Sequence, residues 1–181
     1  SWCEGEEVPF KLKYATPIPG LSAEVSTDIP IENLKLSNFK KISGSNQIIE
    51  KDSFLVVAEL SNKKEEPLDN VYFEIEYSNK YISHLRPNRL VEYSFIGMEE
   101  KINENNENVV VSKFKYGNIF HSKTSTEINF VGNAFEIGSL NNQTGRAIYE
   151  NIQISLMQEG IAEPLATSIL SVKICSIYGC E

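Results

Sequence analysis

The chain has 181 residues, of which 41% are hydrophobic, and its formal net charge is −8. This length fits one large domain or two small ones, and this hydrophobic fraction is typical of a globular protein rather than a disordered one. The acidic balance argues against non-specific nucleic-acid binding, which needs a basic face, and against docking on an anionic membrane surface. The sequence contains no run of roughly 18 apolar residues, so we expect no direct membrane insertion of this segment.

The first part of the chain, residues 1–32, holds four of the seven prolines and one short predicted strand around Phe10. From residue 33 onward, strand patterns recur at a spacing typical of a β-sandwich. The clearest lies at 70–78, where apolar and polar residues alternate and one face would be buried: Val71, Phe73, Ile75 and Tyr77. The other predicted strands of this part are 33–42, 53–60, 90–98, 108–116 and 125–131.

The last part, residues 132–181, contains predicted strands at 134–137, 147–157 and 167–178. Because three strands do not make a sandwich, we expect them to recruit the N-terminal strand. The predicted fold is therefore all-β: an Ig-like antiparallel β-sandwich over 33–131, with a smaller β-layer or second β-domain over 132–181 on which segment 1–32 packs. A single enlarged sandwich is the alternative, and antiparallel pairing is expected throughout.

The region 52–97 also resembles a known class of domain. Its apolar strand ends in Ser61-Asn62, a turn leads to Leu68-Asp69-Asn70-Val71, and Leu85-Arg86-Pro87-Asn88-Arg89 precedes a further strand at Val91-Glu92-Tyr93-Ser94-Phe95. This order is similar to that of CARDB-like and related Ig-like domains of prokaryotic, often archaeal, envelope and S-layer-associated proteins. The resemblance implies an adhesive, spacer or scaffold role and supplies no catalytic residues.

Candidate binding residues are few. We recognise no nucleophile–base pair and no metal-ligand spacing, so we predict no enzyme activity, no catalytic or metal site and no cofactor. Tyr72 is the best candidate for an exposed tyrosine that contacts a glycan or a protein, although strands also use tyrosine in their cores. His84, Arg86 and Arg89 bring scarce basic groups into one predicted turn, which is either a contact for an anionic partner or a solvated loop.

Two covalent features are predicted from the sequence. The three cysteines, Cys3, Cys175 and Cys180, suggest an oxidising, extracytoplasmic setting in which at most one intramolecular disulfide forms. Cys175 with Cys180 would close a short loop, and Cys3 is the alternative partner. Asn142 begins the only Asn-x-Ser/Thr sequon and is a glycosylation candidate.

These observations favour a non-enzymatic, secreted or cell-surface module that adheres, scaffolds or spaces by binding a protein partner or itself. A carbohydrate-binding module that uses exposed tyrosines and the head domain of a pilin-like filament subunit are the alternatives.

Overall fold

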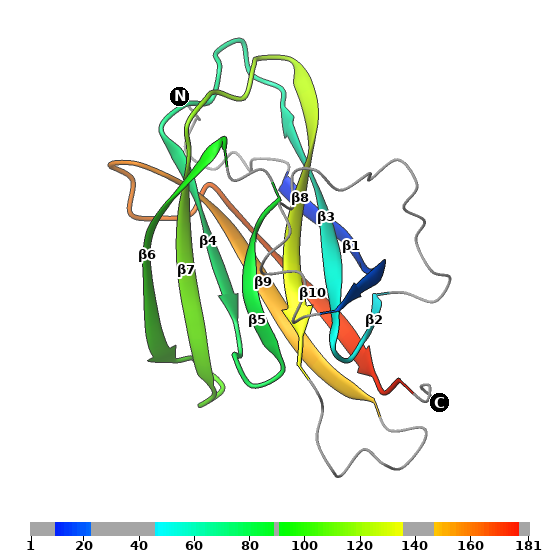
Figure 1. Cartoon of the computed structure of the whole chain (residues 1–181). Helices are drawn as coiled ribbons and strands as arrows, with labels where there is room; N and C mark the ends of the chain where they lie inside the picture. Colours follow the sequence, from blue (N-terminus) through cyan, green and yellow to red (C-terminus); the bar gives the residue numbers. More distant parts are fainter. Residues whose placement is uncertain (1–9, 23–45, 89–90, 136–146, 178–181) are drawn as a thin grey trace.

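The computed structural model describes residues 10–22, 46–88, 91–135 and 147–177, and all regular structure in them is β (Figure 1). No helix in these ranges is long and apolar enough to span a membrane. The ten strands are β1 (Phe10–Ser22), β2 (Gln47–Ile49), β3 (Asp52–Asn62), β4 (Val71–Tyr77), β5 (Ile82–Pro87), β6 (Tyr93–Ile102), β7 (Asn108–Tyr116), β8 (Thr124–Ala134), β9 (Ile148–Gln158) and β10 (Ala166–Cys175).

The strands form two sheets that pack face to face as a sandwich. Sheet A has four strands in the order β1-β3-β8-β5, and sheet B has six in the order β2-β10-β9-β4-β7-β6. All pairs are antiparallel except β2 with β10, whose residues 47–49 run parallel to 173–175. The prediction of antiparallel pairing throughout was therefore wrong at this strand, because a three-residue strand far from its partner in sequence leaves no hairpin signal.

The core lies between the sheets, and the period-two pattern of β4 shows how it forms. Val71, Phe73 and Ile75 are fully buried and Tyr77 is nearly so, which confirms the predicted inward face. Phe73 is the centre of an aromatic cluster, with ring centroids 5.5 Å from Phe10, 5.5 Å from Phe130, 6.1 Å from Tyr93 and 6.5 Å from Phe120.

Strand β3 is buried on both faces, as its nearly continuous apolar run predicts. One face, with Phe54 and Val56, belongs to the main core. The other face, with Leu55 and Val57, belongs to a smaller cluster on the outer side of sheet A.

The strands pair across the boundaries of the three predicted units, 1–32, 33–131 and 132–181. β9 pairs with β4 over six residue pairs, so 148–158 and 71–77 share sheet B. β1 pairs with β3, although the Leu12 amide also donates to Ser168 Oγ of β10 at 3.0 Å. One core cluster contains residues of all three predicted units, which is the single enlarged sandwich given as the alternative. The physical reason is that β4 carries an open edge that β9 fills with in-phase isoleucines.

Most predicted strands match a strand of the structure to within a few residues, with four exceptions. The predicted strand 90–98 lies at Tyr93–Ile102, Ala134 of the predicted strand 134–137 instead ends β8, and neither β2 nor β5 was predicted. Strand β7 has the predicted bounds, whereas the predicted strand 33–42 lies outside the described residues. Residues 85–87, read from the sequence as the start of a turn, belong to β5. A register shift between Ser83 and Arg86, with His84 at a φ of 54°, interrupts the alternation that would have marked this strand.

Candidate functional site

Tyr72 lies on the outward face of β4, in one row with two ion-paired glutamates, Glu74 and Glu76. Its side chain is half-buried. Glu74 Oε1 lies 3.7 Å from Lys113 Nζ, and Glu76 Oε1 lies 3.2 Å from Lys101 Nζ. Tyr72 therefore belongs to a charged surface and not to a row of tyrosines.

The basic candidates His84 and Arg86 lie in β5 rather than in a turn, and Arg89 lies outside the described residues. The Arg86 guanidinium donates to the carbonyl of His84 within the same bulge. Burial lowers the pKa of Arg86, and burial also raises the pKa of the neighbouring Tyr77 hydroxyl. Arg86 is thus partly buried and bonded to its own strand, which is a poor arrangement for capturing an anion.

The covalent candidates are only partly described. Cys175 is buried at the end of β10, while Cys3, Cys180 and Asn142 lie outside the described residues. The disulfide and the glycosylation remain predictions. No group of three or more His, Cys, Asp or Glu in the described ranges is placed to hold a metal ion.

The feature that sequence reasoning missed is the free edge of sheet B. Every open sheet has two edge strands whose backbone groups can pair with another chain, and proteins usually protect them. Three edges here are protected: β2 has three residues, β1 contains Pro17 and Pro19, and β5 is bulged and ends in Pro87. The fourth edge, β6, is ten residues long and contains no proline. It has one bulge, between Phe95 and Gly97, and the five residues after the bulge pair regularly with β7.

Exposed apolar side chains gather along the β6 edge. Of the ten large exposed hydrophobic residues in the described part of the chain, five lie between residues 91 and 102: Val91, Phe95, Ile96, Met98 and Ile102. Three of them, Phe95, Met98 and Ile102, lie on the side of sheet B that faces sheet A. Sheet B has six strands and sheet A has four, so sheet A does not extend over β6, which lies at the left of Figure 1. The side chains of Phe95 and Met98 are therefore 60% and 61% exposed. The apolar residues Phe95, Ile96 and Met98, close together and on both faces of one strand, were the available sequence signal.

The backbone of β6 is also open to pairing. Hydrogen-bonded and non-hydrogen-bonded residue pairs alternate in an antiparallel ladder. The Asn103 amide donates to the Glu107 carbonyl at 2.9 Å, which sets the phase of the β6–β7 hairpin. By that phase, the N–H and C=O groups of Met98, Glu100 and Ile102 point away from β7 and toward the free edge.

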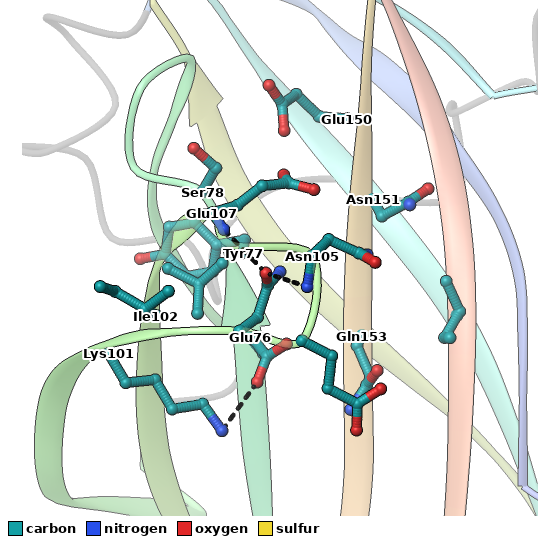
Figure 2. Close-up of a pocket in the computed structure, with 14 residues that line it drawn as sticks. Glu76, Tyr77, Ser78, Lys101, Ile102, Asn105, Glu107, Glu150, Asn151 and Gln153 are labelled. Atoms are coloured by element: carbon teal, nitrogen blue, oxygen red, sulfur yellow. Dashed lines mark hydrogen bonds and ion pairs between the residues drawn. The ribbon is translucent and has the colours of Figure 1, made fainter.

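An acidic groove lies at the Ile102 end of this edge (Figure 2). It has a volume of about 390 Å³, and the β6–β7 hairpin forms one wall. Its described lining contains four glutamates and one lysine, Lys101. Figure 2 shows that Lys101 reaches Glu76. Burial, together with the nearby carboxylate of Glu107, raises the pKa of Glu150 in this groove. The groove therefore gives one end of β6 a negative potential.

Comparisons with known proteins give only remote likenesses. No protein-family model matches the chain, and no curated protein sequence matches it. A cohesin module from a Clostridium perfringens family 33 glycoside hydrolase aligns with 72% of this chain and 91% of its own, at 11% identity and a TM-score of 0.44. A type I cohesin from Clostridium thermocellum, solved with a dockerin, aligns over 72% and 90% at 12% identity and a TM-score of 0.39. The collagen-binding domain of a Staphylococcus aureus adhesin aligns over 72% and 93% at 11% identity and a TM-score of 0.28. With TM-scores below 0.5, these likenesses carry no argument about what the chain binds.

Proposed function

We propose that this chain is a non-enzymatic, extracytoplasmic protein-binding module of the adhesion, scaffold or spacer type, and that its partner adds an extended strand to β6. The observation that carries the proposal is the β6 edge, a long strand without proline where exposed apolar side chains and outward backbone groups coincide. Strand addition uses both features, because main-chain hydrogen bonds supply affinity and alternate side chains supply specificity. The resemblance to CARDB-like domains and the terminal cysteines support the extracytoplasmic setting.

Charge indicates which partner fits this edge. Glu99 and Glu100 lie on β6 itself, and the acidic groove lies at its end. A second copy of the chain would bring another net charge of −8 to this surface. Like charges suppress wrong partners and opposite charges favour the right one, so we propose a different protein whose added strand carries lysine or arginine.

The test uses two lysine substitutions at exposed apolar residues. Extended peptides selected from a display library for binding to the native chain are the probes. Met98→Lys places a charge on the edge strand, whereas Ile161→Lys places the same charge in the connection between β9 and β10, where the native side chain is 45% exposed and does not line the acidic groove. We expect Met98→Lys to lower peptide affinity at least about ten-fold, as a loss of about 1.4 kcal/mol would produce, and Ile161→Lys to leave it unchanged.

Amide hydrogen exchange locates the bound strand. The outward amides of Met98, Glu100 and Ile102 should gain protection when the peptide binds, because they then donate to it. Selected peptides that protect another surface, or equal affinities for the two variants, would refute strand addition at β6. Sedimentation that shows a dimer lost in Met98→Lys would instead identify a second copy as the partner.

A further inference from the structure

Glu100 occupies the middle of the regular part of β6, on the face of sheet B that meets sheet A. Residues 98–102 follow the bulge and pair with β7 without interruption, and Glu100 lies opposite Val110, which is buried in the core. The side chains of Met98, Glu100 and Ile102 therefore share one face, and the same three residues turn their backbone groups toward the free edge. A charge thus stands between two exposed apolar side chains, at the place where another strand would pair.

No cation neutralises Glu100 within the described ranges, unlike two glutamates of β4. Glu74 is ion-paired with Lys113, and Glu76 with Lys101. Lys101 follows Glu100 in sequence but lies on the opposite face of the sheet, where Figure 2 shows that it reaches Glu76. The carboxylate of Glu100 is therefore available to a charge on an added strand.

Space for a side chain of the added strand lies beside Glu100. A hollow of about 360 Å³ is lined in part by Glu100 and Ile102 of β6, Val110 of β7 and Asn79 of the turn between β4 and β5. Lysine and arginine lay their methylene groups along apolar surface and keep the charged end free. Such a side chain can follow Ile102 and Val110 and place its charge at the Glu100 carboxylate.

Self-pairing of β6 would bring two copies of Glu100 together. In an antiparallel pair centred on residue 100, Met98 of one copy lies opposite Ile102 of the other, and Glu100 lies opposite Glu100. Like charges directly opposite each other are destabilising, and inward-pointing charges are one means by which edge strands avoid pairing with themselves. A shift by two residues places Glu100 against Met98 or Ile102, which separates the apolar pairs. Glu100 therefore opposes self-association in each of these registers.

We propose that Glu100 determines which strand pairs with β6: it blocks a second copy of the chain and selects a partner strand of the pattern apolar-x-basic-x-apolar. The basic residue, lysine or arginine, lies opposite Glu100, and the apolar residues lie opposite Met98 and Ile102. This pattern reads the same in both directions, so it holds for parallel and antiparallel addition. The proposal rests on the function proposed above, in which β6 accepts a strand, and it fixes the register of that strand.

The experiment uses the Glu100→Lys variant of the chain as a partner of known sequence. Its own β6 strand has the proposed pattern, because Met98 and Ile102 are retained on either side of the new lysine. Native protein and variant are studied alone and as an equimolar mixture by sedimentation equilibrium. We expect the mixture to associate about three- to thirty-fold more tightly than either protein alone, because one opposite-charge pair replaces a like-charge pair. Hydrogen exchange of the mixture should show protection at the amides of Met98, Glu100 and Ile102.

Two further variants separate a local charge pair from an effect of net charge. Glu127→Lys makes the same change of charge at an exposed residue of β8, in sheet A, so its mixture with native protein should associate no more tightly than native protein alone. Glu100→Gln removes the repulsion without adding a cation, so it should associate with itself about two- to five-fold more tightly than native protein does.

The peptides selected for binding to native protein keep this proposal separate from strand addition itself. They should carry the proposed pattern, and selection against Glu100→Lys should yield an acidic residue at the central position. Peptides that protect the β6 amides but bind native protein and Glu100→Lys equally would refute the role of Glu100 and leave strand addition standing. A mixture no tighter than its components, together with peptides that protect no amide of β6, would refute both. Equal association of the Glu100→Lys and Glu127→Lys mixtures would show that net charge alone is responsible.

Discussion

The aromatic cluster around Phe73 gives the sharpest test of the packing, because sheet B supplies an internal control. Phe73, Phe114 and Phe95 lie side by side on β4, β7 and β6 in one row of the sheet. Phe73 is fully buried under sheet A, whereas Phe95 is 60% exposed on the projecting edge. The same substitution to alanine at the two ends of this row therefore differs mainly in burial.

Phe73→Ala should lower the free energy of unfolding by about 3–5 kcal/mol, the usual effect of truncating a buried phenylalanine. Four ring neighbours within 6.5 Å place the expected value toward the upper end, since each aromatic pair adds roughly 0.5–1.5 kcal/mol beyond its buried area. Phe95→Ala loses one ring contact, with Phe114 at 5.5 Å, and should lower it by about 1 kcal/mol or less.

The measurement is urea denaturation of both variants followed by far-UV circular dichroism. An unchanged dependence of unfolding free energy on urea would show that stability alone has changed. If the two substitutions lower stability by amounts within about 1 kcal/mol of each other, the assignment of Phe73 to the core and Phe95 to the free edge is refuted.

Three further predictions concern other parts of the chain. Gly132→Ala would place a methyl carbon 2.7 Å from the buried Phe54 ring and should lower stability by about 1–3 kcal/mol; a melting temperature equal to that of the native protein would contradict the close approach. Burial raises the pKa of Glu150, so its charged form is disfavoured by folding at neutral pH and this penalty vanishes below the unfolded-state pKa of about 4.3. Glu150→Gln should therefore raise stability at pH 7 and leave it unchanged at about pH 3, and an equal effect at both pH values in chemical denaturation would argue against this origin. Non-reducing peptide mapping should find Cys175 linked to Cys180, and a peptide containing Cys3 in the linkage would select the alternative pairing.

The sequence predicted those strands whose environment is regular. Residues 71–77 alternate strictly because one face meets the core and the other meets solvent, and residues 54–58 are apolar throughout because both faces are covered. These patterns are local, so a single sequence is enough to read them. The bulge at His84 hid β5, because one left-handed residue shifts every following side chain to the other face.

The candidate site was harder to predict, because it depends on which strands lie at the edges. Tyr93 and Phe95 alternate with Ser94 as the residues of a core strand do, and only the sheet order shows that β6 is an edge strand. Met98 is apolar in a predicted strand, which usually indicates a buried position. Its exposure follows from the unequal widths of the two sheets, a property of the whole fold that no local pattern records.

The strand order of sheet B also constrains how the chain folds. Two hairpins, β6–β7 and β9–β10, join neighbours in sequence and can form early. The centre of the sheet cannot, because β4 lacks its second partner until β9 has been made. The pairing of β2 requires the last strand, β10. Topologies dominated by such distant pairings fold slowly, because loop-closure entropy is lost before the contacts form. During synthesis, the β4 edge that β9 finally covers therefore stays open until residues 148–158 have emerged from the ribosome.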